Sequence, residues 1–127
     1  MKKYILLLLP LLSFALELKI NVENIDIKRG GDIYIGIYNS ENDFLKKEYR
    51  GQIFRVSKSI KADFNLSKGI YSIAIFHDEN RDGELNKNFI GIPKEGYGFS
   101  NNVIFPSFNN SKIDLSKSTN IDIEMRY

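Results

Sequence analysis

Apolar side chains recur at every second position through most of the chain. The alternation is clearest at residues 17–23, 33–38, 60–66 and 121–127. Charged or amide side chains occupy the positions between the apolar ones in three of these stretches, and tyrosine and glycine occupy them at residues 33–38. A period of two is typical of a β-strand that has one buried face and one solvated face. These four stretches are therefore predicted to be half-buried antiparallel strands.

The segment at residues 70–76 is apolar on both faces, which predicts a central strand that is covered on both sides. Residues 41–49 are expected to hold one helical turn. Three shorter strands are predicted at residues 52–56, 103–105 and 112–115. Seven or eight short strands, separated by turn signals such as Gly30-Gly31, predict an all-β fold: a single antiparallel β-sandwich of the transthyretin-like or immunoglobulin-like kind.

The sequence LSKGIY at residues 66–71 resembles a tyrosine corner. In that motif a glycine turns the chain, and the tyrosine hydroxyl bonds to the backbone a few residues upstream. Tyr71 is therefore expected to be structural. A ligand-binding role is the minority alternative.

Residues 1–15, MKKYILLLLPLLSFA, combine two lysines, an apolar run, and small residues at positions 13 and 15. This order is typical of a cleaved secretory signal peptide, and the apolar run is shorter than the ~20 residues of a membrane-spanning helix. We expect a mature chain of residues 16–127 that forms one domain, carries no membrane span, and is periplasmic or secreted.

Loss of Lys2 and Lys3 with the signal leaves 16 of the 18 basic residues against 16 acidic ones, so the mature chain has no net charge. Nucleic-acid binders need a basic surplus to neutralise phosphates, and this balance argues against that class. The chain also has no cysteine, which excludes disulfides, zinc-thiolate sites and thiol catalysis.

The predicted central strand leads into HDENRDGELN at residues 77–86, here called the acidic loop. Numbered as a calcium-binding loop, it has oxygen-bearing side chains at positions one, three and five, glycine at six, a backbone carbonyl at seven and an amide at nine. The loop therefore predicts a Ca2+ site formed by Asp78, Asn80, Asp82, Glu84 (through its carbonyl) and Asn86.

Position twelve of a calcium-binding loop is normally a bidentate glutamate, and here it is Phe89. Glu95 is the later acid that we expect to be within reach. A plain polar loop is the alternative, because Asp, Asn and Gly also favour Asx-turns and left-handed backbone.

Glycines, aromatic rings and polar groups alternate through residues 88–102. Aromatic rings supply contact area and amides supply direction, so this segment is predicted to recognise a protein, peptide or glycan ligand. The alternative is a long connection whose aromatics fix it to the edge of the sandwich. The candidate ligand-binding residues are His77, Lys94, Glu95, Tyr97, Phe99, Asn101 and Asn102.

His77 is the single histidine of the chain. As a catalytic base it would need an orienting carboxylate, such as Asp78 or Glu95, which defines a small envelope hydrolase as the alternative function. A lone histidine at a strand end more often donates one hydrogen bond to a loop carbonyl. We therefore expect a binding module and not an enzyme. A structural subunit that pairs through edge strands is a third alternative.

The run YSIAIFHDENRDGELNKNFIGIPKEGYGFSNN, followed by FPSF and a closing alternating strand, resembles the DUF2141 family of uncharacterised exported bacterial proteins. The resemblance implies a small exported β domain with a layout similar to transthyretin-like or carboxypeptidase-regulatory sandwiches. The family's acidic loop often reads DENGNGKLD, so Arg81 and Asn86 depart from it. The catalytic residues and terminal YRGS of transthyretin-like hydroxyisourate hydrolases have no counterpart here.

The sequence DFNLS at residues 63–67 fits an extended acceptor sequon for N-linked glycosylation, with an acid two positions before Asn65. Asn65 is predicted on the outward face of its strand. A chance match to the sequon is the alternative. Asn109-Asn110-Ser111 has the minimal form of the sequon.

Overall fold

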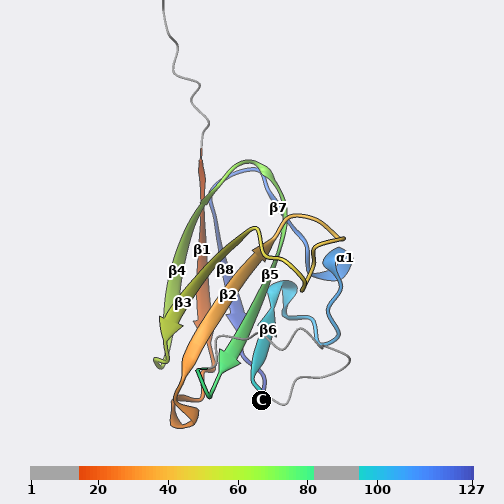
Figure 1. Cartoon of the computed structure of the whole chain (residues 1–127). Helices are drawn as coiled ribbons and strands as arrows, with labels where there is room; N and C mark the ends of the chain where they lie inside the picture. Colours follow the sequence, from red (N-terminus) through yellow and green to blue (C-terminus); the bar gives the residue numbers. More distant parts are fainter. Residues whose placement is uncertain (1–14, 82–94) are drawn as a thin grey trace, which may run out of the picture.

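Two β-sheets pack face to face in the computed structural model, which describes residues 15–81 and 95–127 (Figure 1). Within these ranges there are eight strands, so the chain is an all-β sandwich, as predicted. The smaller sheet has the order β4 (Ile60–Leu66), β1 (Leu16–Glu23), β8 (Thr119–Glu124). The larger has the order β3 (Arg50–Arg55), β2 (Asp32–Tyr38), β5 (Gly69–Asp78), β6 (Tyr97–Phe99), and β7 (Ile113–Leu115) pairs with the first residues of β5.

Helical structure in the described residues is confined to three short pieces: η1 (Ile27–Arg29), η2 (Ser100–Asn102) and α1 (Phe108–Ser111). Residues 41–46 form consecutive turns, in which the Lys46 N–H donates to the Asp43 carbonyl at 2.8 Å. No helix in the described part of the chain is both long and apolar enough to cross a bilayer.

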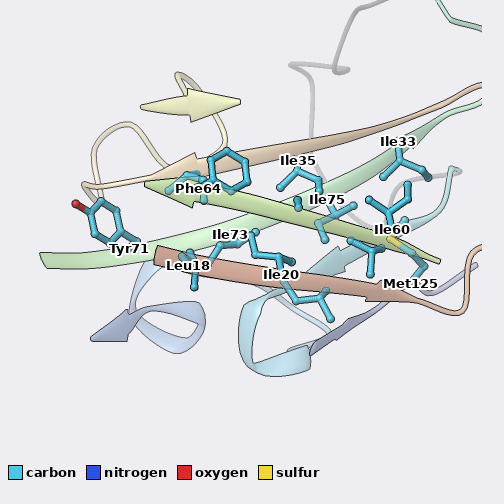
Figure 2. Packing of buried hydrophobic residues seen from close by; sticks show 14 of the residues in the cluster. Leu18, Ile20, Ile33, Ile35, Ile60, Phe64, Tyr71, Ile73, Ile75 and Met125 are labelled. Carbon is cyan, nitrogen blue, oxygen red and sulfur yellow. The ribbon is translucent and has the colours of Figure 1, made fainter. Parts of the chain in front are cut away.

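The main core lies between the two sheets. Figure 2 shows Leu18 and Ile20 of β1 packed with isoleucines of β2 and β5. Ile35 and Ile75, which are paired across those two strands, are fully buried. Burial of one such side chain contributes about 1.5–3 kcal/mol, so the alternating positions of the strands supply much of the stability.

A second cluster covers the outer face of the larger sheet and consists of the buried residues Tyr38, Ala74, Phe76, Tyr97 and Phe99. Phe44 and Leu45 of the β2–β3 loop pack against it, as does Val103. Strand β5 is thus covered on both faces, which confirms the prediction of a central strand at residues 70–76.

The expectation that the strands are antiparallel throughout is wrong for one pair. Strand β8 runs parallel to β1, with Leu18 opposite Thr119 and Glu23 opposite Glu124. Parallel strands need a long crossover, and the chain between β1 and β8 supplies one because it includes the whole larger sheet.

The predicted strand at residues 103–105 is also wrong, and β6 lies earlier, at Tyr97–Phe99. The chain leaves β6 through two residues in the left-handed region, Asn101 (φ 62°) and Asn102 (φ 52°). Val103 then packs inward, whereas Phe105 is 73% exposed. The apolar run therefore forms a surface loop.

The tyrosine corner is confirmed. The Tyr71 hydroxyl donates to the Ser67 carbonyl at 2.7 Å, across the turn between β4 and β5. Tyr71 is 5% exposed and packs in the main core, so it is structural, as expected.

Candidate functional site

Four parts of the chain meet at the end of the sandwich where β5 ends, at the bottom of Figure 1. They are η1, the end of β5, the start of β6 and the residues after β8. The His77 N–H donates to the Gly96 carbonyl at 2.9 Å, and Tyr97 and Arg126 exchange two backbone hydrogen bonds of 3.0 and 2.7 Å. These bonds fix both ends of the chain that connects β5 to β6.

The imidazole of His77 is fully buried at this end of the core. Its Nε2 lies 2.5 Å from the Gly30 carbonyl oxygen, and its Nδ1 lies 2.8 Å from the Tyr127 hydroxyl. A carbonyl oxygen can only accept, so Nε2 carries a hydrogen. In the neutral ring Nδ1 is then the acceptor, and the hydroxyl of Tyr127 donates to it.

Tyr127 completes this arrangement. Its hydroxyl accepts from the Asp26 N–H at 3.0 Å, and its ring makes an edge contact with His77, with centroids 5.6 Å apart. The guanidinium of Arg29 lies 4.7 Å from the centre of the Tyr127 ring, a cation–π geometry. Tyr127 is 46% exposed as a whole, and the partial burial of its hydroxyl raises the pKa of that group.

These contacts join both sheets. His77 belongs to β5 of the larger sheet, Tyr127 follows β8 of the smaller one, and Gly30 lies on the link from β1 to β2. A catalytic base must reach its substrate within hydrogen-bond range. Both nitrogens of His77 are already bonded to protein groups, a geometry that counts against its use as a base.

The acidic loop leaves the larger sheet at Asp78, the last residue of β5, which pairs with Asp32 of β2. Two arginines contact the acids at this point. Arg29 bonds to Glu79 at 2.8 Å and to Asp26 at 3.1 Å, and Arg81 lies 3.7 Å from Asp32. The first residues of the loop are therefore held by ion pairs to η1 and β2.

Of the predicted calcium ligands, Asp78 and Asn80 are described and lie where the chain leaves β5. The others, Asp82, Glu84 and Asn86, lie outside the described residues, as does Lys94. Among residues 15–81 and 95–127 no three His, Asp or Glu side chains are grouped in a way that could hold a metal ion. The calcium site stays a prediction.

The other predicted ligand-binding residues have contacts within the fold. Tyr97 and Phe99 are 7% and 2% exposed, in the second cluster. The amide nitrogen of Asn101 donates to the carbonyls of Asn110 (3.1 Å) and Lys112 (3.0 Å). Asn102 accepts from the Glu124 N–H at 3.0 Å. Glu95 directly precedes Gly96. A ligand role for these residues stays a prediction.

Two exposed apolar residues escaped the sequence-based prediction of a site. Ile104 and Phe105 are 49% and 73% exposed, and the Asn110 amide holds the Phe105 carbonyl at 2.9 Å. Ser107 and Asn110 form a reciprocal capping box at the start of α1, which fixes the loop further. In the sequence, Ile104 and Phe105 belong to the apolar run at residues 103–105, which was interpreted as a strand.

The fold and this end of the molecule place the chain in the class of small all-β sandwiches with a long, anchored inter-strand connection. Residues 20–123 match a family described as "Uncharacterized protein conserved in bacteria (DUF2141)". The chain therefore belongs to the DUF2141 family, which confirms the resemblance seen in its sequence. No curated protein and no solved structure matches it.

Proposed function

We propose that this chain is an exported β-sandwich that binds a protein, peptide or glycan in the cell envelope and is not an enzyme. The supporting observation is the hydrogen bond from the His77 N–H to the Gly96 carbonyl. This bond holds together the two ends of the β5–β6 connection, where the chain leaves the larger sheet and where it re-enters it. Two residues suffice to join adjacent antiparallel strands, whereas this connection takes residues 79–96. Long connections on a firm scaffold are a common setting for binding sites.

A calcium ion orders this connection in our proposal. Carboxylate, amide and carbonyl oxygens at alternate positions suit a hard cation, and Asp78 and Asn80 begin such a series at the end of β5. Position twelve of the loop is Phe89, which has no carboxylate, and in this proposal Glu95, next to the anchored Gly96, supplies the missing acid. Without a glutamate at position twelve, we expect an affinity on the order of 10⁻⁴ to 10⁻³ M, as in extracellular calcium modules.

The two hydrogen bonds of the His77 ring support the part of the proposal that the chain is not an enzyme. A hydrolase would need one nitrogen to turn toward a substrate, and this would break the bond to Gly30 or to Tyr127. Such a break leaves a buried polar group without a partner, at a cost of about 1–3 kcal/mol.

Thermal unfolding of residues 16–127 tests the calcium proposal. A ligand at ten times its dissociation constant stabilises the native state by about 1.4 kcal/mol, so millimolar Ca2+ should raise the Tm above that in chelator. Asp82→Ala should abolish this rise. Asp114→Ala, an exposed acid of β7, is the matched control and should keep it. An unchanged Tm of the native chain between calcium and chelator would dismiss the ion.

A further inference from the structure

We propose that Asn65 is an acceptor site for an N-linked oligosaccharide, which an oligosaccharyltransferase adds after export. The inference rests on the export of the chain, which belongs to the proposed function. An acid, the acceptor amide and a hydroxyl stand two positions apart, at Asp63, Asn65 and Ser67. Strand β4 carries the first two of these groups, and Ser67 directly follows the strand.

Strand β4 turns alternate side chains to opposite faces. Phe64 and Leu66 are 5% and 2% exposed and pack in the main core, whereas Asp63 and Asn65 are exposed. Side chains two positions apart on a strand share one face, at roughly 6.5–7 Å. Ser67 is the first residue after the strand and is also exposed. Asp63 and Asn65 therefore share the solvated face of β4, and all three groups of the sequon are exposed.

These side chains are available for recognition. Strand β4 is at the edge of its sheet and pairs there only with β1, where Asn65 lies opposite the half-exposed Glu17. Gln52 and Tyr71 bond to the backbone carbonyls of Asp63 and Ser67, not to their side chains. Within residues 15–81 and 95–127, no hydrogen bond or ion pair engages the side chains of the sequon.

The second sequon, at Asn109, is built differently. Two positions before it stands Ser107, which supplies no carboxylate. The serine of this sequon, Ser111, is fully buried. Its hydroxyl donates to the Ser107 carbonyl and lies 2.5 Å from the Ser72 hydroxyl. The folded protein thus hides the hydroxyl of this sequon and exposes that of the Asn65 sequon.

The transfer needs a lipid-linked sugar donor. The amide nitrogen of Asn65 forms a bond to the anomeric carbon of an oligosaccharide carried on a polyprenyl pyrophosphate. The bond between sugar and phosphate breaks, the polyprenyl pyrophosphate leaves, and one amide proton is released. Asp63 contributes a carboxylate that a cationic group of the transferase can bind.

A glycan at Asn65 would leave the acidic loop clear. Asn65 lies opposite Glu17, near the start of β1, whereas His77 and η1 lie beyond the other end of that strand. Asn65 and the two described ends of the β5–β6 connection therefore lie at opposite ends of the sandwich.

Mass spectrometry of the exported protein tests the proposal. The full chain is produced in a Gram-negative host with a periplasmic oligosaccharyltransferase that recognises an acid two positions before the asparagine. Trypsin releases residues 62–68, which contain the whole Asn65 sequon, and residues 95–112, which contain Asn109. We expect the first peptide to gain the mass of the host oligosaccharide and the second to remain unmodified.

Four variants complete the experiment. Asn65→Gln, Asp63→Ala and Ser67→Ala should each abolish the mass gain, and Asn109→Gln should leave it unchanged. All four positions are exposed, so we expect Tm values close to that of the native chain. An unmodified 62–68 peptide in a protein that starts at residue 16 would overturn the acceptor site and leave export intact. An unmodified peptide in a chain that retains residues 1–15 would overturn both proposals.

Discussion

At the scale of the residue, His77 closes one end of the core with polar contacts. Its two ring nitrogens meet the Gly30 carbonyl and the Tyr127 hydroxyl, and that hydroxyl also accepts from the Asp26 N–H. Each buried group has a partner, so the desolvation cost of a buried imidazole is offset. The expectation that a lone histidine at a strand end bonds a loop carbonyl agrees with the contact to Gly30.

Tyr127→Phe should lower the free energy of unfolding by about 1–3 kcal/mol, because it leaves Nδ1 of His77 without its donor. Tyr49→Phe is the matched control. Tyr49 is 39% exposed, stacks on Tyr71, and its hydroxyl makes no hydrogen bond within the described ranges. We expect a loss of about 0.5 kcal/mol or less for the control. Urea unfolding measures the free energy of unfolding of both variants. Equal decreases for the two variants would contradict the hydrogen bond between the Tyr127 hydroxyl and His77 as a source of stability.

At the scale of the element, the turn from η1 into β2 positions the start of the acidic loop. Gly30 and Gly31 both adopt positive φ, at 64° and 78°. A side chain at Gly31 would overlap backbone atoms of Asp78 and Glu79, whereas one at Gly30 would meet no atom within 4 Å. Gly31 therefore allows the turn to pack directly against the end of β5.

The two glycines offer a matched pair of variants. Both Gly30→Ala and Gly31→Ala place a side chain on a residue with positive φ, which costs on the order of 1–3 kcal/mol. Gly31→Ala must also displace the backbone at Glu79, whose Cα would lie 2.8 Å from the new Cβ. We expect Gly31→Ala to lower the Tm clearly more than Gly30→Ala. Similar Tm values for the two variants would contradict the close packing of the turn.

The alternation of side chains predicted β1, β2 and β4 well, because each contributes a face to a core, and the continuous apolar run at residues 70–76 predicted β5. It missed β6, whose three residues are all buried and show no alternation. It also missed α1, which depends on the local capping box of Ser107 and Asn110. The parallel pairing of β1 with β8 could not be predicted, because alternation shows which face is buried and not the direction of the neighbouring strand.

At the scale of the whole molecule, the site joins segments that are distant in sequence. The contacts of His77 span 47 and 50 positions, and the bond from Asp26 to Tyr127 spans 101. The sequence predicted the acidic loop because its oxygens are close together in the chain. It could not predict Arg29 or Tyr127 as parts of the site, because no local pattern marks them.

Burial of tyrosines should make the whole molecule sensitive to alkali. It raises the pKa of four hydroxyls, those of Tyr34, Tyr38, Tyr71 and Tyr127. The folded state therefore holds these protons more tightly than the unfolded chain. The resulting stabilisation is complete below the ordinary tyrosine pKa near 10 and is lost as the pH rises toward the pKa of the folded state.

Urea unfolding from pH 8 to pH 11 should thus show a free energy that falls above pH ~10. Tyrosinate absorbance provides the second measurement, since the folded protein should ionise fewer tyrosines at pH 11 than the same protein in urea. Identical titration curves for the folded and unfolded states would contradict the burial of these hydroxyls.

We propose that the β5–β6 connection is a cation-ordered binding loop held between His77 and Gly96. Calcium titration of the mature chain, followed by amide NMR, tests it most directly. The account predicts saturable shifts within residues 78–95, with the amides of β1 and β4 unchanged. Amide spectra that stay the same up to ten millimolar calcium, or shifts spread evenly over both sheets, would contradict it.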